Sequence, residues 1–306
     1  MSPSTRSPAA WGPYLAAGGA ILCWASLAAA LGTSLDAVLP EQVLFHGMLA
    51  AGLALAAWDW ARGAPLHRAW PGPRVALLGV YGIFGYHALL VFAFSLAPRV
   101  PANILNYTWP LWIILLGRWG RGGRLSGRAL AGGLLGLAGV ALVIGGGAVG
   151  DFDPLVHAAG LALALAAGFC WGSFTVLLRR WGPPGGNPMA LFCLLSALAA
   201  GLLMLARGVP FGFAAGQIWL VLYIGIVPWG LAFALWDRAA RGCDLRRLGL
   251  LSYFTPPLST ALLALVSGAA VGLPLAAGLA LILAGSAWGG TAPRAAGGQP
   301  AGAPRS

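Results

Sequence analysis

Long apolar stretches, separated by short polar or glycine- and proline-rich connections, follow one another along most of the 306 residues. A helix needs about 20 apolar residues to cross the hydrocarbon core of a bilayer, and each stretch has about this length. The predicted spans are residues 11–31, 39–58, 74–96, 100–117, 128–148, 157–178, 188–206, 217–237, 246–268 and 273–289. The pattern therefore predicts an all-α integral membrane protein with ten transmembrane helices.

The last five predicted spans echo the first five at an offset of about 146 residues. The echoes are 23–26 (CWAS) with 170–173 (CWGS), 107–110 (YTWP) with 253–256 (YFTP), and 137–141 (LAGVA) with 283–287 (LAGSA). Because five is odd, the second unit enters the membrane from the opposite side. The sequence thus predicts two inverted five-helix repeats around a central cavity, an arrangement typical of secondary transporters.

This division gives five segments: a cytosolic tail (1–10), a first repeat (11–148), an extracytosolic connector (149–156), a second repeat (157–289) and a cytosolic tail (290–306) that we expect to be disordered. With both ends in the cytosol, only Arg99 and Arg207 of the chain's arginines fall on the outer side. Arginine retained on the cytosolic side is the usual signature of orientation in membrane proteins.

Composition agrees with residence in a bilayer. Hydrophobic residues make up 59% of the chain and charged residues 8%, whereas a soluble domain carries about 25% charged residues. The net charge of +11 follows the cytosolic arginines, so it indicates orientation in the membrane rather than a nucleic-acid partner. We expect lipid and a small molecule as partners, and a monomer or a homodimer.

Chemistry-bearing motifs are few. The four histidines and four cysteines have no metal-site spacing, and no nucleotide-binding loop or nucleophile motif occurs. We therefore predict no enzyme, no cofactor and no metal. The predicted spans carry no carboxylate near their centres, which argues against a buried acidic ion carrier and leaves His87 as the titratable group near the midplane. His87 would be either a core histidine bonded to a carbonyl or a donor or acceptor in a cavity.

The fourth and ninth spans contain polar residues beside proline. Asn106, Tyr107 and Pro110 share one helical face, and Tyr253 and Pro256 repeat the pattern. Proline removes a backbone hydrogen bond, and lipid cannot satisfy the freed carbonyl. The interruption therefore indicates a watery cavity, with helix packing as the alternative, and makes the two prolines candidate hinges.

Three tryptophans, Trp24, Trp109 and Trp171, lie well inside predicted spans rather than at the interfaces where tryptophan usually gathers. They would either pack in the core or present flat faces to an aromatic or cationic substrate.

The residues at 86–87 (YH), 106–110 (NYTWP) and Trp171 resemble those of the drug/metabolite transporter superfamily with two EamA-type repeats, and most closely its aromatic amino acid exporters. The resemblance implies export across the bacterial inner membrane. It also implies that Tyr86, His87, Tyr107, Trp109 and Trp171 line a central cavity, which Trp24 joins as the repeat partner of Trp171.

These observations favour an inner-membrane exporter of amino acids, aromatic or large and neutral, that works by alternating access. The expected substrate-binding residues are Trp24, Tyr86, His87, Asn106, Tyr107, Trp109, Trp171 and Tyr253, with Pro110 and Pro256 as hinges. The alternative on the same fold is an exporter of drugs or other small metabolites. A membrane enzyme or receptor fits less well, because no catalytic constellation is present.

Overall fold

The computed structural model describes residues 11–35, 37–63, 70–97, 99–117, 126–145, 155–182, 188–259, 262 and 273–290. We call the described residues up to 145 the first half and those from 155 onward the second half. Both halves consist of helices joined by short turns.

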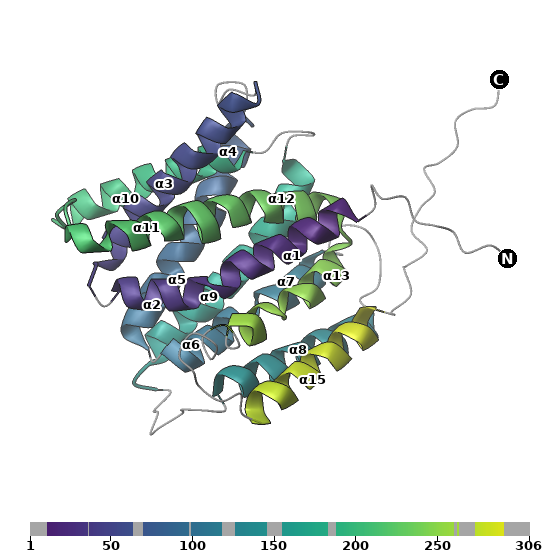
Figure 1. Cartoon of the computed structure of the whole chain (residues 1–306). Coiled ribbons are helices and arrows are strands. Elements are labelled where there is room, and N and C mark those ends of the chain that lie inside the picture. Colours follow the sequence, from purple (N-terminus) through teal and green to yellow (C-terminus); the bar gives the residue numbers. More distant parts are fainter. Residues whose placement is uncertain are drawn as a thin grey trace, which may run out of the picture.

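The first half contains α1 (Gly12–Ala25), α2 (Leu27–Leu35), α3 (Pro40–Ala61), α4 (Pro73–Val80), η3 (Tyr81–Gly85), α5 (Tyr86–Leu96), α6 (Arg99–Asn106), α7 (Trp109–Leu116) and α8 (Gly127–Gly145). The second half contains α9 (Ala158–Trp181), α10 (Met189–Ala206), η4 (Ala215–Gln217), α11 (Ile218–Ile224), η5 (Gly225–Leu231), α12 (Ala232–Gly242), α13 (Leu245–Ser252) and α15 (Leu273–Gly290). Figure 1 shows these helices crossing one another in a single bundle.

Helical residues lie in each of the ten ranges expected from hydropathy. Five continuous helices in the described residues are long and apolar enough to cross a bilayer: Pro40–Ala61, Pro73–Leu96, Ala158–Trp181, Met189–Ala206 and Ala215–Gly242. Shorter apolar helices cover Gly12–Ala25, Gly127–Leu142 and Ala276–Gly289. The protein is thus an all-helical, multi-pass membrane protein. The ten-span topology, its inverted symmetry and the segment boundaries stay predictions, and both expected tails lie outside the described residues.

Several helices are interrupted near their middles. The chain leaves the helix at residues 107–108 and again at 253–254, and each time a proline, Pro110 or Pro256, lies in the first turn that follows. Proline suits a first turn because that position requires no N–H donor. The expected kinks are therefore full interruptions between two short helices.

Two further helices contain π-helical segments, η3 and η5. Such segments shift the hydrogen-bonding pattern by one residue and are frequent at functional sites. Pro228 lies inside η5, where its missing N–H is compatible with the altered pattern. Both segments lie in the long helix that forms the third predicted span of its half.

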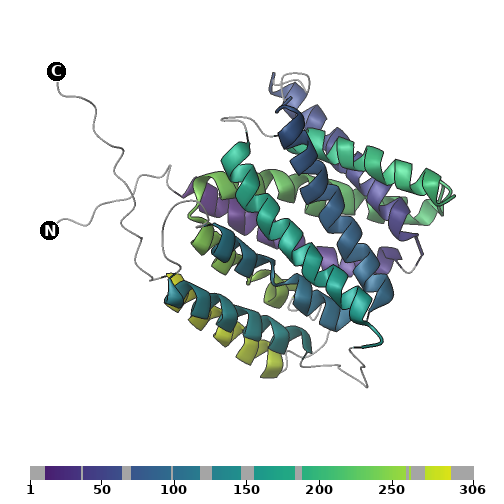
Figure 2. The ribbon, with the colours of Figure 1, turned by 180° about the vertical axis from the view of Figure 1, so that it is seen from behind.

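Glycines allow close contact between the helices. A Cβ added at Gly132 on α8 would lie 2.5 Å from the carbonyl oxygen of Gly285 on α15, so these two helices touch backbone to backbone. They run side by side at one edge of the bundle in both views (Figures 1 and 2). Gly79 and Gly82 in the α4–η3 helix receive the rings of Phe192 and Phe174 from the second half.

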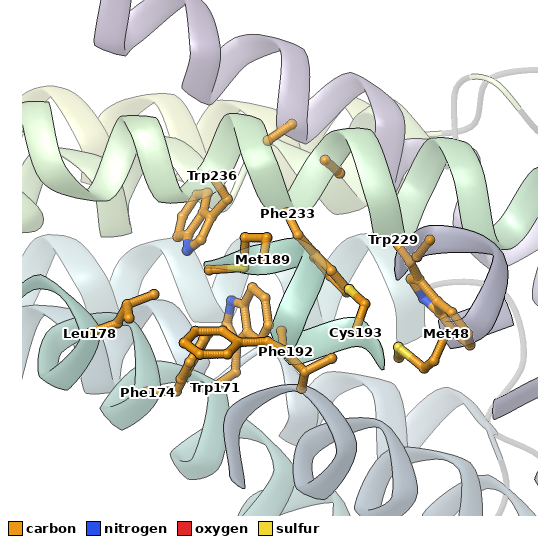
Figure 3. Packing of buried hydrophobic residues seen from close by; sticks show 14 of the residues in the cluster. Met48, Trp171, Phe174, Leu178, Met189, Phe192, Cys193, Trp229, Phe233 and Trp236 are labelled. Atoms are coloured by element: carbon orange, nitrogen blue, oxygen red, sulfur yellow. The ribbon is translucent and has the colours of Figure 1, made fainter. Parts of the chain in front are cut away.

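The largest cluster of buried residues joins the two halves. Figure 3 shows Trp171 and Phe174 of α9 facing Phe233 and Trp236 of α12, while Trp229 lies beside Met48 of α3. Aromatic rings from both halves thus form one continuous interior, and the cavity described next lies against it.

Candidate functional site: a central cavity

A cavity of about 220 Å³ lies between helices of both halves. The residues that border it are Trp24, Leu27, Leu31, Leu35, Tyr86, His87, Leu90, Phe94, Asn103, Asn106, Tyr107, Trp109, Trp171, Phe233 and Thr255. Its wall therefore combines aromatic rings, leucines and a few uncharged polar groups, which is the usual composition of a site for a small molecule.

The structure brings together seven of the eight residues expected to bind substrate: Trp24, Tyr86, His87, Asn106, Tyr107, Trp109 and Trp171 all border this cavity. Tyr253 does not. It is fully buried in a separate cluster with Val140 and Ile282, and its ring covers Gly136. The turn at 253–254 directs the Tyr253 side chain toward α8 and α15, and Thr255 reaches the cavity instead. Pro110 and Pro256 are buried beside the two interruptions.

Aromatic rings form the wall at one end of the cavity. Trp24 lies edge to face against Trp171, with ring centroids 5.6 Å apart, and against Trp109 at 6.1 Å. Tyr86 packs on Trp171 at 5.1 Å. The indole N–H of Trp24 donates to the carbonyl oxygen of Pro228 at 2.9 Å, so a carbonyl of the η5 segment in the second half fixes the orientation of this ring.

The polar part of the wall comes from α6 and from the turn before Thr255. Asn106 Nδ2 donates to the hydroxyl of Tyr86 at 3.4 Å. Within the described part of the chain, neither Asn106 Oδ1 nor Thr255 Oγ1 has a hydrogen-bond partner. Buried polar atoms are normally paired. Two unpaired atoms on one cavity wall therefore indicate a place for a polar ligand or for water.

His87 borders the same space, and its ring is oriented by its own helix. Nδ1 lies 2.7 Å from the carbonyl oxygen of Ile83. A carbonyl can only accept, so Nδ1 carries the proton and Nε2 is the acceptor of the neutral ring. Of the two readings weighed from the sequence, the geometry combines both: His87 is bonded to a carbonyl and it lines the cavity.

The structure is closed on the side of the tryptophan cluster away from Leu35 and Phe94. Trp236 packs on Trp24 and Trp109, with centroids 5.1 and 5.4 Å apart, and donates its N–H to Thr175 Oγ1 at 3.2 Å. Beyond them, the side chain of Arg179 donates to the carbonyl oxygen of Cys243 at 2.6 Å. These contacts join α9 to α12 and to the turn after it.

Several cavity residues were not expected from the sequence. Leu27 and Leu31 follow Trp24 at helical spacing, and Leu90 and Phe94 follow His87 in the same way, so periodicity from the chosen residues would have indicated them. Phe233 and Thr255 gave no such signal. Their place depends on how far each second-half helix is rotated, which a uniformly apolar sequence does not encode.

The site contains binding groups without reactive ones. Among the described residues, no three His, Cys, Asp or Glu side chains gather as metal ligands, and the groups that border the cavity carry no formal charge when His87 is neutral. A multi-pass helical membrane protein with a neutral central cavity belongs, by architecture, to the class of small-molecule transporters.

Comparison with known proteins agrees with that class. Residues 11–145 match the model of the EamA-like transporter family. An aromatic amino acid exporter YddG from Ancylobacter novellus is 36% identical over 88% of this chain and 93% of its own length. A probable terminal-alkyne amino-acid exporter from Streptantibioticus cattleyicolor is 26% identical over 78% of this chain and 80% of its own length. A solved crystal structure with 34% identity covers 90% of the chain and 96% of its own, with a TM-score of 0.81.

The chain belongs to the EamA-like transporter family, and within it resembles the aromatic amino acid exporters. It is accordingly a membrane transporter and not an enzyme.

Proposed function

We propose that the protein exports amino acids with aromatic or large neutral side chains across the bacterial inner membrane. The observation that carries the proposal is the cavity wall, which has indole and phenol rings at one end and uncharged hydrogen-bonding groups beside them. A zwitterion with an apolar side chain matches such a wall. The names of two relatives, an aromatic and a terminal-alkyne amino acid exporter, point to the same substrate class.

The proposed transport cycle is alternating access between two inverted five-helix repeats, with both ends of the chain in the cytosol. The interruptions at 107–108 and 253–254, at equivalent places in the two repeats, support this arrangement, and Pro110 and Pro256 are the proposed hinges. In this topology Leu35 and Phe94 lie toward the outside, so the cavity described above faces outward. The contact of Trp236 with Thr175 then closes the cytosolic side.

Transport of labelled phenylalanine, tryptophan, threonine and lysine into proteoliposomes, with and without a pH gradient, tests the proposal. We expect saturable flux of the aromatic pair. Flux that ignores the gradient would fit a facilitator, and flux driven by it would make His87 the first residue to examine. Absence of any amino acid flux from folded protein contradicts the proposal and favours a drug or another metabolite as cargo.

A cavity-filling variant connects this flux to the site. Leu31→Trp adds an indole where Leu31 borders the cavity, and we expect it to remove most of the flux while the protein stays folded, because the space it fills is empty. Leu22→Trp on the same helix is the matched control, since Leu22 is 63% exposed on the outer face of α1. Equal flux in the two variants would remove this cavity from the transport path.

A further inference from the structure

Two polar atoms on the cavity wall have unused hydrogen-bonding capacity. Asn106 is 4% exposed and Thr255 is 3% exposed, and in the described part of the structure Asn106 Oδ1 and Thr255 Oγ1 lack any partner. Leaving a buried acceptor unpaired is costly, and lipid offers no donor that could relieve it. Since both residues border the same cavity, a molecule that enters it is the natural partner.

The fold supplies these atoms from equivalent places in the two halves. Asn106 is the last residue of α6, directly before the interruption at 107–108, and Thr255 directly follows the interruption at 253–254. Each side chain is thus fixed by a helix end rather than by a loop. Helix ends hold polar groups more rigidly than loops do, which suits recognition of a ligand.

The orientation of Asn106 decides which kind of atom it presents. Its Nδ2 donates to Tyr86, so the carbonyl oxygen is left for the ligand, and that oxygen can only accept. Neutral His87 adds a second acceptor, because its Nδ1–H is already bonded to Ile83. The wall therefore contains more fixed acceptors than fixed donors.

Two donors that could have served a carboxylate are unsuitable. The indole N–H of Trp24 is bonded to Pro228, and no arginine or lysine is among the described residues that border the cavity. Aromatic faces beside the acceptors also attract a cation. The wall is thus suited to a group with several N–H donors and a positive charge.

We propose that Asn106 Oδ1 and Thr255 Oγ1 bind the ammonium group of the transported molecule, while Trp24 and Trp171 contact its aromatic side chain. This inference rests on the proposed function and deepens it: the protein selects its cargo by the primary ammonium group. The carboxylate contributes less to recognition. Aromatic amines that lack a carboxylate are then ligands of the same cavity.

Competition against labelled phenylalanine flux in proteoliposomes tests the assignment. The competitors are 2-phenylethylamine, which keeps the ammonium group, and 3-phenylpropanoate, which keeps the carboxylate. We expect the amine to compete at a concentration within about tenfold of that of phenylalanine itself, and the carboxylate to need about a hundredfold more, since a hydrogen bond to a charged group is worth roughly one to two powers of ten in affinity. Competition by the carboxylate but not by the amine leaves the proposed function standing and overturns the assignment. Absence of phenylalanine flux overturns both.

Variants connect this preference to the two atoms. Thr255→Val removes the hydroxyl and keeps the shape, and Asn106→Leu removes the acceptor; each should raise the half-saturating phenylalanine concentration about tenfold and narrow the difference between the two competitors. Ser196→Ala is the matched control, because the Ser196 hydroxyl is also buried and unpartnered but does not border the cavity. If Asn106→Leu does not fold, Thr255→Val alone decides: an unchanged preference in that variant overturns the proposal.

Discussion

Thr175 is a single side chain on which the closed end of the cavity depends. Its hydroxyl accepts from the Trp236 indole and donates to the carbonyl oxygen of Trp171. Thr175→Val keeps the shape but leaves a buried indole N–H unpaired, so we expect the free energy of unfolding in detergent to fall by about 1–3 kcal/mol. Chemical or thermal unfolding followed by tryptophan fluorescence measures it.

A double-mutant cycle isolates this bond from the loss of packing. Trp236→Phe removes the donor, and Thr175→Val in that background should then cost less than it does in the unchanged protein. Additive losses would mean that the hydrogen bond contributes nothing, and that the two side chains act through packing alone.

Tyr253 and Thr255 show how far single residues could be predicted from sequence. The echo of Tyr107 at Tyr253 suggested two equivalent cavity tyrosines, but only Tyr107 borders the cavity. Two residues along a helical backbone differ by about 200° in direction. A small difference in the turn at 253–254 is therefore enough to exchange Tyr253 for Thr255, and nothing in the sequence indicates it.

Among pairs of helices, α8 and α15 depend most directly on small residues. The backbone of Gly132 touches Gly285 and Gly289, so an added methyl group has no space. We expect Gly132→Ala to lower the free energy of unfolding by about 1–3 kcal/mol. Gly18→Ala on α1 is the matched control, because no atom lies within 4 Å of the added Cβ. Equal melting temperatures of the two variants would contradict the described contact.

Hydropathy alone was sufficient to locate the helices, because a bilayer demands long apolar segments whatever their packing. Pro110 and Pro256 also indicated where two of them are interrupted. The π-helical segments η3 and η5 were not predicted: the extra residue in such a turn changes the backbone bonding without changing the polarity of the sequence. Pro228 inside η5 was the one available sign of an altered helix.

Across the whole molecule, the distribution of arginine predicts that both ends of the chain face the cytosol. A fluorescent protein fused after residue 306 should then fluoresce in bacterial cells, and alkaline phosphatase fused there should be inactive. Phosphatase inserted between residues 150 and 151, in the predicted outer connector, should be active. The opposite pattern would reverse the proposed direction of the cavity and would leave the helix arrangement unchanged.

The contacts between the two halves differ in kind between the interior and the rim. In the interior, Tyr81 bonds to Ser173, Tyr223 to Ser26, and Trp24 to Pro228, all without formal charge. At the rim, Glu41 pairs with the half-exposed Arg207 at 3.2 Å. Dissolved ions weaken a solvent-exposed charged pair, but they have no comparable effect on uncharged groups buried from water. Ionic strength therefore acts on the edge of this joint, and the cohesion of the two halves in brine or in dilute buffer depends on neutral hydrogen bonds.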